Sequence, residues 1–109
     1  MATTYKVLGQ SNPSATTLTT LYTVPSATNA VISSITIANL AATSATFRIA
    51  VRVAGASIAN SQYIAYDITL GASDTTVLTM GVTMNATDVL SVYASSATVT
   101  FTAFGSEIA

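Results

Sequence analysis

Short runs rich in Val, Ile, Thr, Tyr and Phe alternate along the whole chain with clusters of Gly, Asn, Asp, Ser and Pro. β-branched and aromatic residues favour strands, and the small polar residues favour turns. No segment sustains the spacing of three and four residues that an amphipathic helix requires. The pattern therefore predicts an all-β protein.

The clearest alternation covers the segment 47–53, in which apolar side chains alternate with Arg48, Ala50 and Arg52. The apolar members are Phe47, Ile49, Val51 and Val53. Because successive side chains of a strand point to opposite faces, this pattern predicts one apolar row in the core and both arginines on the outer face.

The other predicted strands are separated by turn residues. They cover 4–8, 17–24, 30–40, 63–70, 75–84, 88–94 and 98–104. Gly9 is expected to end the first strand, and Pro25 the second, because proline cannot donate a hydrogen bond to a ladder. In the segment 63–70, alternation predicts that Tyr63 lies outside and Tyr66 lies in the core.

One domain is expected from a chain of 109 residues. A single sheet of this size would leave an apolar face in water, so we predict an antiparallel β-sandwich of about eight strands, jelly-roll or immunoglobulin-like, spanning residues 1–109. Residues 1–14 are expected to form an edge strand or an arm.

Charge is scarce, because only 6% of the residues are charged and the net charge is -1, whereas soluble domains average about 25% charged residues. Much of the surface is therefore expected to be covered by partner subunits. Lys6, Arg48 and Arg52 are the whole basic inventory, which argues against nucleic-acid binding. No apolar run is long enough for a membrane-spanning helix, and the start does not have the pattern of a signal peptide.

The residue types used in catalysis are almost missing. The chain has no His and no Cys, so a Ser or Thr nucleophile would have no usual base. Asp67, Asp74, Asp88 and Glu107 are the only carboxylates. Asp74 and Asp88 follow Ser or Thr in predicted turns, where shaping the backbone is a commoner role than binding a hard cation. We expect a protein without catalytic residues, cofactor or metal.

An interface is the expected role of the outward row that carries the arginines. We predict that Arg48, Arg52, Tyr63 and Asp67 contribute to it, because a guanidinium binds carboxylates through a rigid fork and exposed aromatic residues are enriched in interfaces. Pairing of an arginine with Asp67 within the sheet is an alternative. A third interpretation is that this row is simply a strand face exposed to solvent, without a binding role.

Several segments resemble a family of small tailed-bacteriophage virion proteins. They are 21–25 (LYTVP), 35–40 (ITIANL), 46–52 (TFRIAVR), 62–67 (QYIAYD) and 104–108 (FGSEI). The resemblance extends from about Leu8 to Ile108. It implies a head decoration or cement protein, a small β-sandwich that sits on the capsid as a homodimer or homotrimer and bridges major capsid subunits.

The function expected from these observations is that of a virion structural protein assembled in the host cytoplasm, at the capsid surface in preference to the tail. A tail, neck or fibre subunit would use the same sandwich faces. A carbohydrate- or receptor-binding module is a third hypothesis, with Asn60, Gln62 and Tyr63 as its candidate residues, although the chain contains no Trp.

Overall fold

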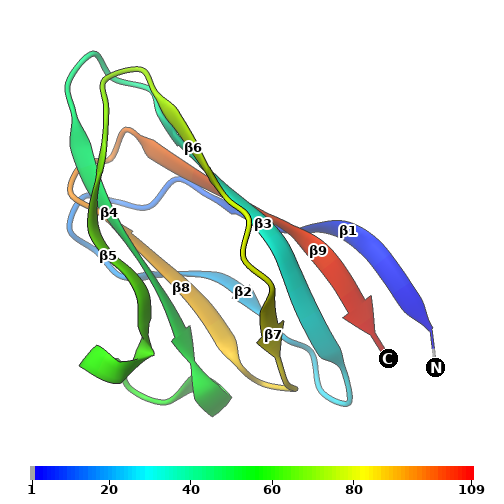
Figure 1. Cartoon of the computed structure of the whole chain (residues 1–109). Helices are drawn as coiled ribbons and strands as arrows, with labels where there is room; N and C mark the ends of the chain where they lie inside the picture. Colours follow the sequence, from blue (N-terminus) through cyan, green and yellow to red (C-terminus); the bar gives the residue numbers. More distant parts are fainter. Residues whose placement is uncertain (1) are drawn as a thin grey trace.

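The computed structural model describes residues 2–109, which form nine β-strands (Figure 1). The strands are β1 (Thr3–Ser11), β2 (Thr19–Thr23), β3 (Asn29–Asn39), β4 (Ala45–Arg52), β5 (Tyr63–Leu70), β6 (Thr75–Leu78), β7 (Val82–Met84), β8 (Val89–Ala94) and β9 (Val99–Ile108). Two short 3-10 turns, η1 (Val53–Gly55) and η2 (Asn60–Gln62), lie between β4 and β5. The all-β prediction is confirmed. Residues 2–109 include no helix of the length and hydropathy needed to cross a membrane.

The strands form two antiparallel sheets that pack against each other. The first sheet has the order β1-β9-β3-β6, with β7 also paired to β3, and the second has the order β2-β8-β4-β5. β1 thus pairs with the last strand, β2 with the one before it, and β4 with its successor β5. This nested pairing is that of a jelly roll, one of the two sandwich types expected.

Nine strands appear in place of eight because the predicted strand 75–84 is interrupted. β6 pairs with residues 35–38 of β3, and β7 pairs with Ala30, Val31 and Ile32. Residues 79–81 lie between them, beside the irregularity that β3 has between Ile32 and Ser34. A bulge disrupts the ladder locally, so β6 and β7 act as two halves of one jelly-roll strand.

The core lies between the sheets and is centred on two aromatic rings. Phe47 of β4 and Phe101 of β9 are fully buried and meet edge to face, with their centroids 6.2 Å apart. Ile49 is also fully buried, so the predicted inward row is confirmed for these residues of β4. It is wrong for Val53, which is 65% exposed because β4 ends at Arg52 and the chain turns into η1.

Tyr66 was expected in the core, and this prediction is wrong. Ile49 pairs with Ala65 and Phe47 pairs with Ile68, so Tyr66 and Asp67 together oppose the single residue Arg48. This is a β-bulge, and Asp67 adopts a left-handed φ of 49° within it. Tyr66 itself lies on the outer face because an earlier register shift, at Ile64 between the Ala50–Tyr63 and Ile49–Ala65 pairs, has already reversed the expected alternation. Tyr66 is 54% exposed.

β1 is an outer strand of the first sheet, and its N-terminal end lies beside the C-terminal end of β9 (Figure 1). It continues to Ser11 and does not end at Gly9, because a register shift between Val7 and Gly9 absorbs one residue and pairing then resumes. Gly9 is needed there because a Cβ atom would lie 2.2 Å from the carbonyl oxygen of Leu21. β1 therefore passes very close to β2 at this point.

Candidate interface on the outer face of the second sheet

Arg48 is the centre of a cluster on the outer face of the second sheet, which we call the Arg48 cluster and which comprises Arg48, Tyr63, Tyr66, Asp67 and Tyr93. Its Nε donates to Asp67 Oδ1 at 2.6 Å, and its Nη2 donates to Oδ2 at 3.2 Å. The guanidinium also lies over the rings of Tyr66 and Tyr93, at 4.1 and 4.3 Å from their centroids. Two stacked rings and a bidentate carboxylate therefore fix one arginine.

The bulge in β5 builds this cluster. It places Tyr66 and Asp67 consecutively on the outer face opposite Arg48, while Tyr93 is the cross-strand neighbour of Arg48 on β8. An alternating β5 would have turned one of the two toward the core. The bond from Arg48 lowers the pKa of the Asp67 carboxyl and raises the pKa of the Arg48 guanidinium. Both groups stay charged over the ordinary pH range.

Tyr63 extends the cluster toward the η2 turn. Its ring meets that of Tyr66 edge to face, with a centroid distance of 4.9 Å. Together with Asn60 these two rings line a pocket of about 430 Å³. Gln62 does not line this pocket, because its side-chain oxygen accepts a hydrogen bond from the Ala59 backbone N–H at 2.7 Å. The pocket presents two phenols and one amide.

Arg52 has a different role from Arg48, although both belong to the outward row of β4. Its Nε donates to the carbonyl oxygen of Ala56 at 2.7 Å, and its Nη2 donates to that of Gly55 at 3.1 Å. It thereby fastens the chain after η1. Of the four predicted interface residues, the structure brings Arg48, Tyr63 and Asp67 together and leaves Arg52 apart from them.

Glu107 belongs to a second polar cluster, which the sequence analysis did not predict. The Tyr22 phenol donates a hydrogen bond to Glu107 Oε2, and Lys6 Nζ lies 2.7 Å from Oε1. These bonds lower the pKa of Glu107, whereas burial, followed by the bond to Glu107, raises the pKa of Tyr22 well above its ordinary value of 10. The signal available in the sequence was a single carboxylate, Glu107, within the otherwise uncharged segment 99–108.

The two turn carboxylates bind backbone groups. Asp88 is buried, and its two oxygens accept hydrogen bonds from the N–H groups of Ala54 and Asn85 at 2.8 and 2.9 Å. Asp74 accepts one from Thr75 N–H at 2.8 Å. Asp88 thus ties the η1 turn to the turn before β8. Each carboxylate has a structural use in shaping the backbone.

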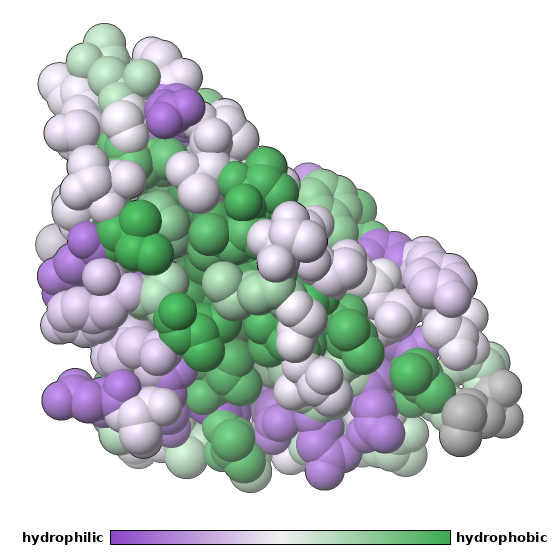
Figure 2. Space-filling model, in the orientation of Figure 1, coloured by the Kyte–Doolittle hydropathy of each residue, from purple (hydrophilic) through white to green (hydrophobic). Residues whose placement is uncertain are grey.

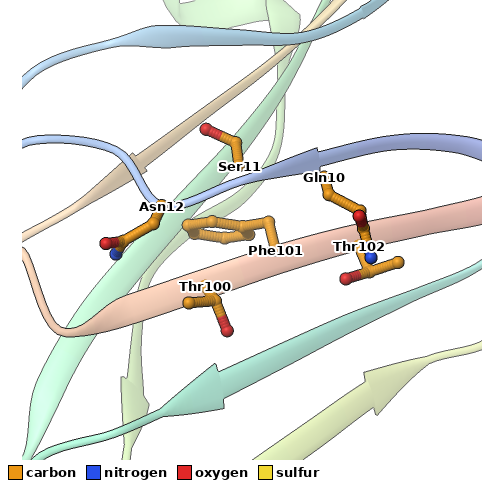
Figure 3. A pocket seen from close by; sticks show the side chains of 6 residues that line it. All are labelled: Gln10, Ser11, Asn12, Thr100, Phe101 and Thr102. Carbon is orange, nitrogen blue, oxygen red and sulfur yellow. The ribbon is translucent and has the colours of Figure 1, made fainter.

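A shallow pocket of about 370 Å³ lies along the boundary between β1 and β9 (Figure 3). Its lining residues are Gln10, Ser11, Asn12, Thr100, Phe101 and Thr102. Asn12 is already engaged, because its amide donates to the carbonyl oxygens of Ala97 and Val99 at 2.9 Å each. The lining contains hydroxyl, amide and aromatic side chains and no acidic or basic one.

Large apolar side chains are exposed on both sheets and in the connections between strands. They are Tyr5, Val7, Leu40, Val53, Ile58, Ile64, Tyr66, Ile68, Val77 and Phe104. Figure 2 shows apolar side chains gathered between β5 and the edge formed by β6 and β7. Apolar surface of this kind is typical of surfaces that other molecules cover.

No protein-family model matches the sequence, and no curated protein matches it either.

Proposed function

We propose that this protein is a non-enzymatic structural subunit of a bacteriophage virion, a decoration or cement protein that bridges major capsid subunits on the head. The resemblance of the sequence to small tailed-phage virion proteins supports this proposal. The jelly-roll fold is compatible with it, since viral capsid proteins use that fold, although lectins and enzymes use it too.

The observation that carries the proposal is the use made of charge. The chain has three basic and four acidic residues, and each of these side chains has a partner within the chain. Lys6–Glu107 and Arg48–Asp67 are ion pairs, and Arg52, Asp74 and Asp88 bind backbone groups. The surface left for contact is rich in hydroxyl groups and apolar side chains. Such a surface suits packing against neighbouring subunits better than it suits a soluble monomer.

Many weak contacts of this kind are effective when they repeat. A subunit that touches several lattice neighbours through neutral faces gains avidity without one strong contact. The Arg48 cluster is the candidate contact on the second sheet, because Tyr66 is exposed, Tyr63 and Tyr93 are half-buried, and its two charges neutralise each other. The partners are further copies of the chain, as a homodimer or homotrimer, and the major capsid protein.

The test is a cryo-electron microscopy reconstruction of the particle that encodes this chain, with copy number measured by quantitative mass spectrometry. Density over the head lattice at a copy number comparable to that of the capsid protein supports the proposal. A few copies at the neck, tail or fibres would replace it with the alternative structural position. Absence of the chain from purified particles would overturn both.

A second candidate function, carbohydrate or receptor binding, is favoured by the pocket of Asn60, Tyr63 and Tyr66. Phenol rings stack on the apolar faces of sugars, and an amide bonds to their hydroxyls. A glycan array with the intact protein tests it, with Tyr63→Ala as the variant and Tyr5→Ala, an exposed tyrosine on the other sheet, as the control. Binding lost only in Tyr63→Ala would support this function, and an array without hits would remove it.

A further inference from the structure

The four outer strands of the sandwich differ in how they are protected against pairing with another chain. β2 is only five residues long and has a register shift, and β5 has two register shifts. The edge formed by β6 and β7 is interrupted at residues 79–81. Short strands, bulges and breaks are the usual devices that prevent edge-to-edge association.

β1 lacks these devices over its first half. Thr3–Val7 pair with β9 in an unbroken register, and the first irregularity comes only after Val7. All five residues are exposed, and Tyr5 is 83% exposed. Lys6 would ordinarily discourage pairing, but its charge is neutralised by Glu107 of the same chain at 2.7 Å. This edge is therefore open to a further strand.

The hydrogen-bond phase of the ladder shows which backbone groups are free. Ala2 and Ala109 exchange both backbone hydrogen bonds, each at 2.9 Å. Antiparallel pairs alternate between bonded and non-bonded types, so Thr4 and Lys6 bond to β9, while Thr3, Tyr5 and Val7 direct their N–H and C=O groups outward. These three residues alternate along the open edge.

We propose that two copies of this chain pair through β1, antiparallel and about a two-fold axis at Tyr5, so that the first sheets of both copies join into one. Tyr5 then exchanges both bonds with Tyr5 of the second copy, and Thr3 does so with Val7. On the inner face, Thr4 of one copy comes opposite Lys6 of the second copy. Thr4 also pairs with Glu107 of its own chain, so Glu107 and Lys6 of the second copy flank Thr4 in one cross-strand row. Each such row therefore contains one negative and one positive charge.

The outer face of the joint is apolar and continuous with a groove on the same sheet. Val7 is 48% exposed and lies beside Phe104 of β9, which is 38% exposed. Tyr5 and Phe104 line a groove of about 430 Å³ together with Val31 of β3. The two-fold arrangement brings the Tyr5 rings of both copies together over this surface. Backbone bonds and apolar contact therefore support the same register.

The chain contains no cysteine, so single cysteines report this register directly. The Cα atoms of a bonded antiparallel pair lie about 5.5 Å apart, within the range that a disulfide spans. Under mild oxidation, we expect Tyr5→Cys to form disulfide-linked dimers. Thr3→Cys and Val7→Cys should cross-link with each other in a mixture at least tenfold faster than either does alone. Val77→Cys, at a site that is 57% exposed on another edge, is the control.

Proline supplies the second test. Tyr5→Pro removes an outward N–H that β9 does not use, so the protomer should keep its strand content by circular dichroism while its dimer is lost in sedimentation. Tyr5→Thr keeps the N–H and should retain a dimer. A monomer at all concentrations for the unaltered protein, or cross-linking of Tyr5→Cys no faster than of Val77→Cys, would overturn the proposal.

Pairing through β1 rests on the proposed function only in that a subunit of a capsid lattice needs contacts with other copies of the same chain. The two are tested on different samples, isolated protein and intact particle. A monomeric protein abundant on heads would overturn the pairing alone. A dimer absent from particles would overturn the function alone.

Discussion

The phenol of Tyr22 on β2 donates a hydrogen bond to the carboxylate of Glu107 on β9, and so joins the two sheets of the sandwich. Tyr22 is 8% exposed, and Lys6 of β1 holds the other carboxylate oxygen. The contact lies near the end of the molecule where β1 begins and β9 ends. Three strands thus meet at one carboxylate.

Tyr22→Phe is expected to lower the free energy of unfolding by about 1–3 kcal/mol, because a hydrogen bond to a charged group is lost while the carboxylate stays half-buried. Chemical denaturation of both proteins measures the difference. The matched control is Tyr5→Phe, since the Tyr5 side chain is almost fully exposed. Equal losses in the two variants would contradict a special role for the Tyr22 bond.

Stability is expected to fall at both ends of the pH range. The folded-state pKa of Glu107 is lowered from its ordinary 4.5, so its contribution is present above pH 4.5 and is lost as the pH falls through the lowered value. The pKa of Tyr22 is raised from 10, so its contribution is present below pH 10 and is lost as the pH rises through the raised value.

Melting temperature measured against pH checks this, with tyrosinate absorbance following the phenol. In Tyr22→Phe the melting temperature should fall less at high pH, and in Glu107→Gln it should fall less at low pH. If the melting temperature of Glu107→Gln still falls at low pH as it does in the unaltered protein, the loss of stability there belongs to Asp67, whose pKa is lowered as well.

Arg48→Ala is expected to weaken binding to the particle while leaving the protein folded, because Arg48 lies on the outer face and holds Tyr66 and Tyr93 in place. Arg52 is a poor choice for this test, since it fastens the loop after η1. Asp67→Asn, which keeps the stacked rings, should have a smaller effect. Co-sedimentation with particles that lack the protein measures both, and unchanged binding of Arg48→Ala would exclude the Arg48 cluster as an interface.

Phe47→Ala is expected to destabilise the domain by about 3–5 kcal/mol, since it removes a fully buried ring and leaves a cavity beside Phe101. Thermal or chemical unfolding measures the loss. Val77→Ala, at an exposed site on β6, provides the control and should be close to neutral. A loss below about 1 kcal/mol for Phe47→Ala would place the ring outside the core.

Gly105→Ala is expected to disturb the pairing of β9 with β3, because a Cβ atom at Gly105 would lie 2.0 Å from the Val31 carbonyl oxygen. Backbone cannot yield as a flexible side chain can. Gly81→Ala is the control, since no atom lies within 4 Å of a Cβ there. Hydrogen exchange of β3 amides should accelerate in Gly105→Ala and stay unchanged in Gly81→Ala.

Periodicity predicted the fold where strands are regular and failed where they are not. Phe47 and Ile49 were assigned to the core correctly because β4 pairs with β8 in an unbroken register. Tyr66 was assigned wrongly because the register shift at Ile64 has no signature in the pattern of apolar residues. Strand bounds shifted for the same reason at Gly9, which marks a close approach of two backbones and not an end.

The candidate site was predictable only in part. The outward row of β4 indicated Arg48, and the parity of β5 indicated Tyr63 and Asp67. The sequence did not indicate that Arg52 would turn to its own loop, since that depends on the path of η1. Glu107 was missed because its partners, Tyr22 and Lys6, lie far away along the chain and only the fold brings them together.

The nested pairing of the jelly roll also sets the order in which the molecule can form. β1 precedes the other eight strands along the chain, yet it hydrogen-bonds to β9, which is synthesised after all of them. Pairings between distant segments form slowly, because closing the long loop between them costs conformational entropy before any contact stabilises the pair. We therefore expect the first sheet to fold only after β9 has been synthesised. Until then, the edge of β1 that pairs with β9 stays unpaired in the nascent chain.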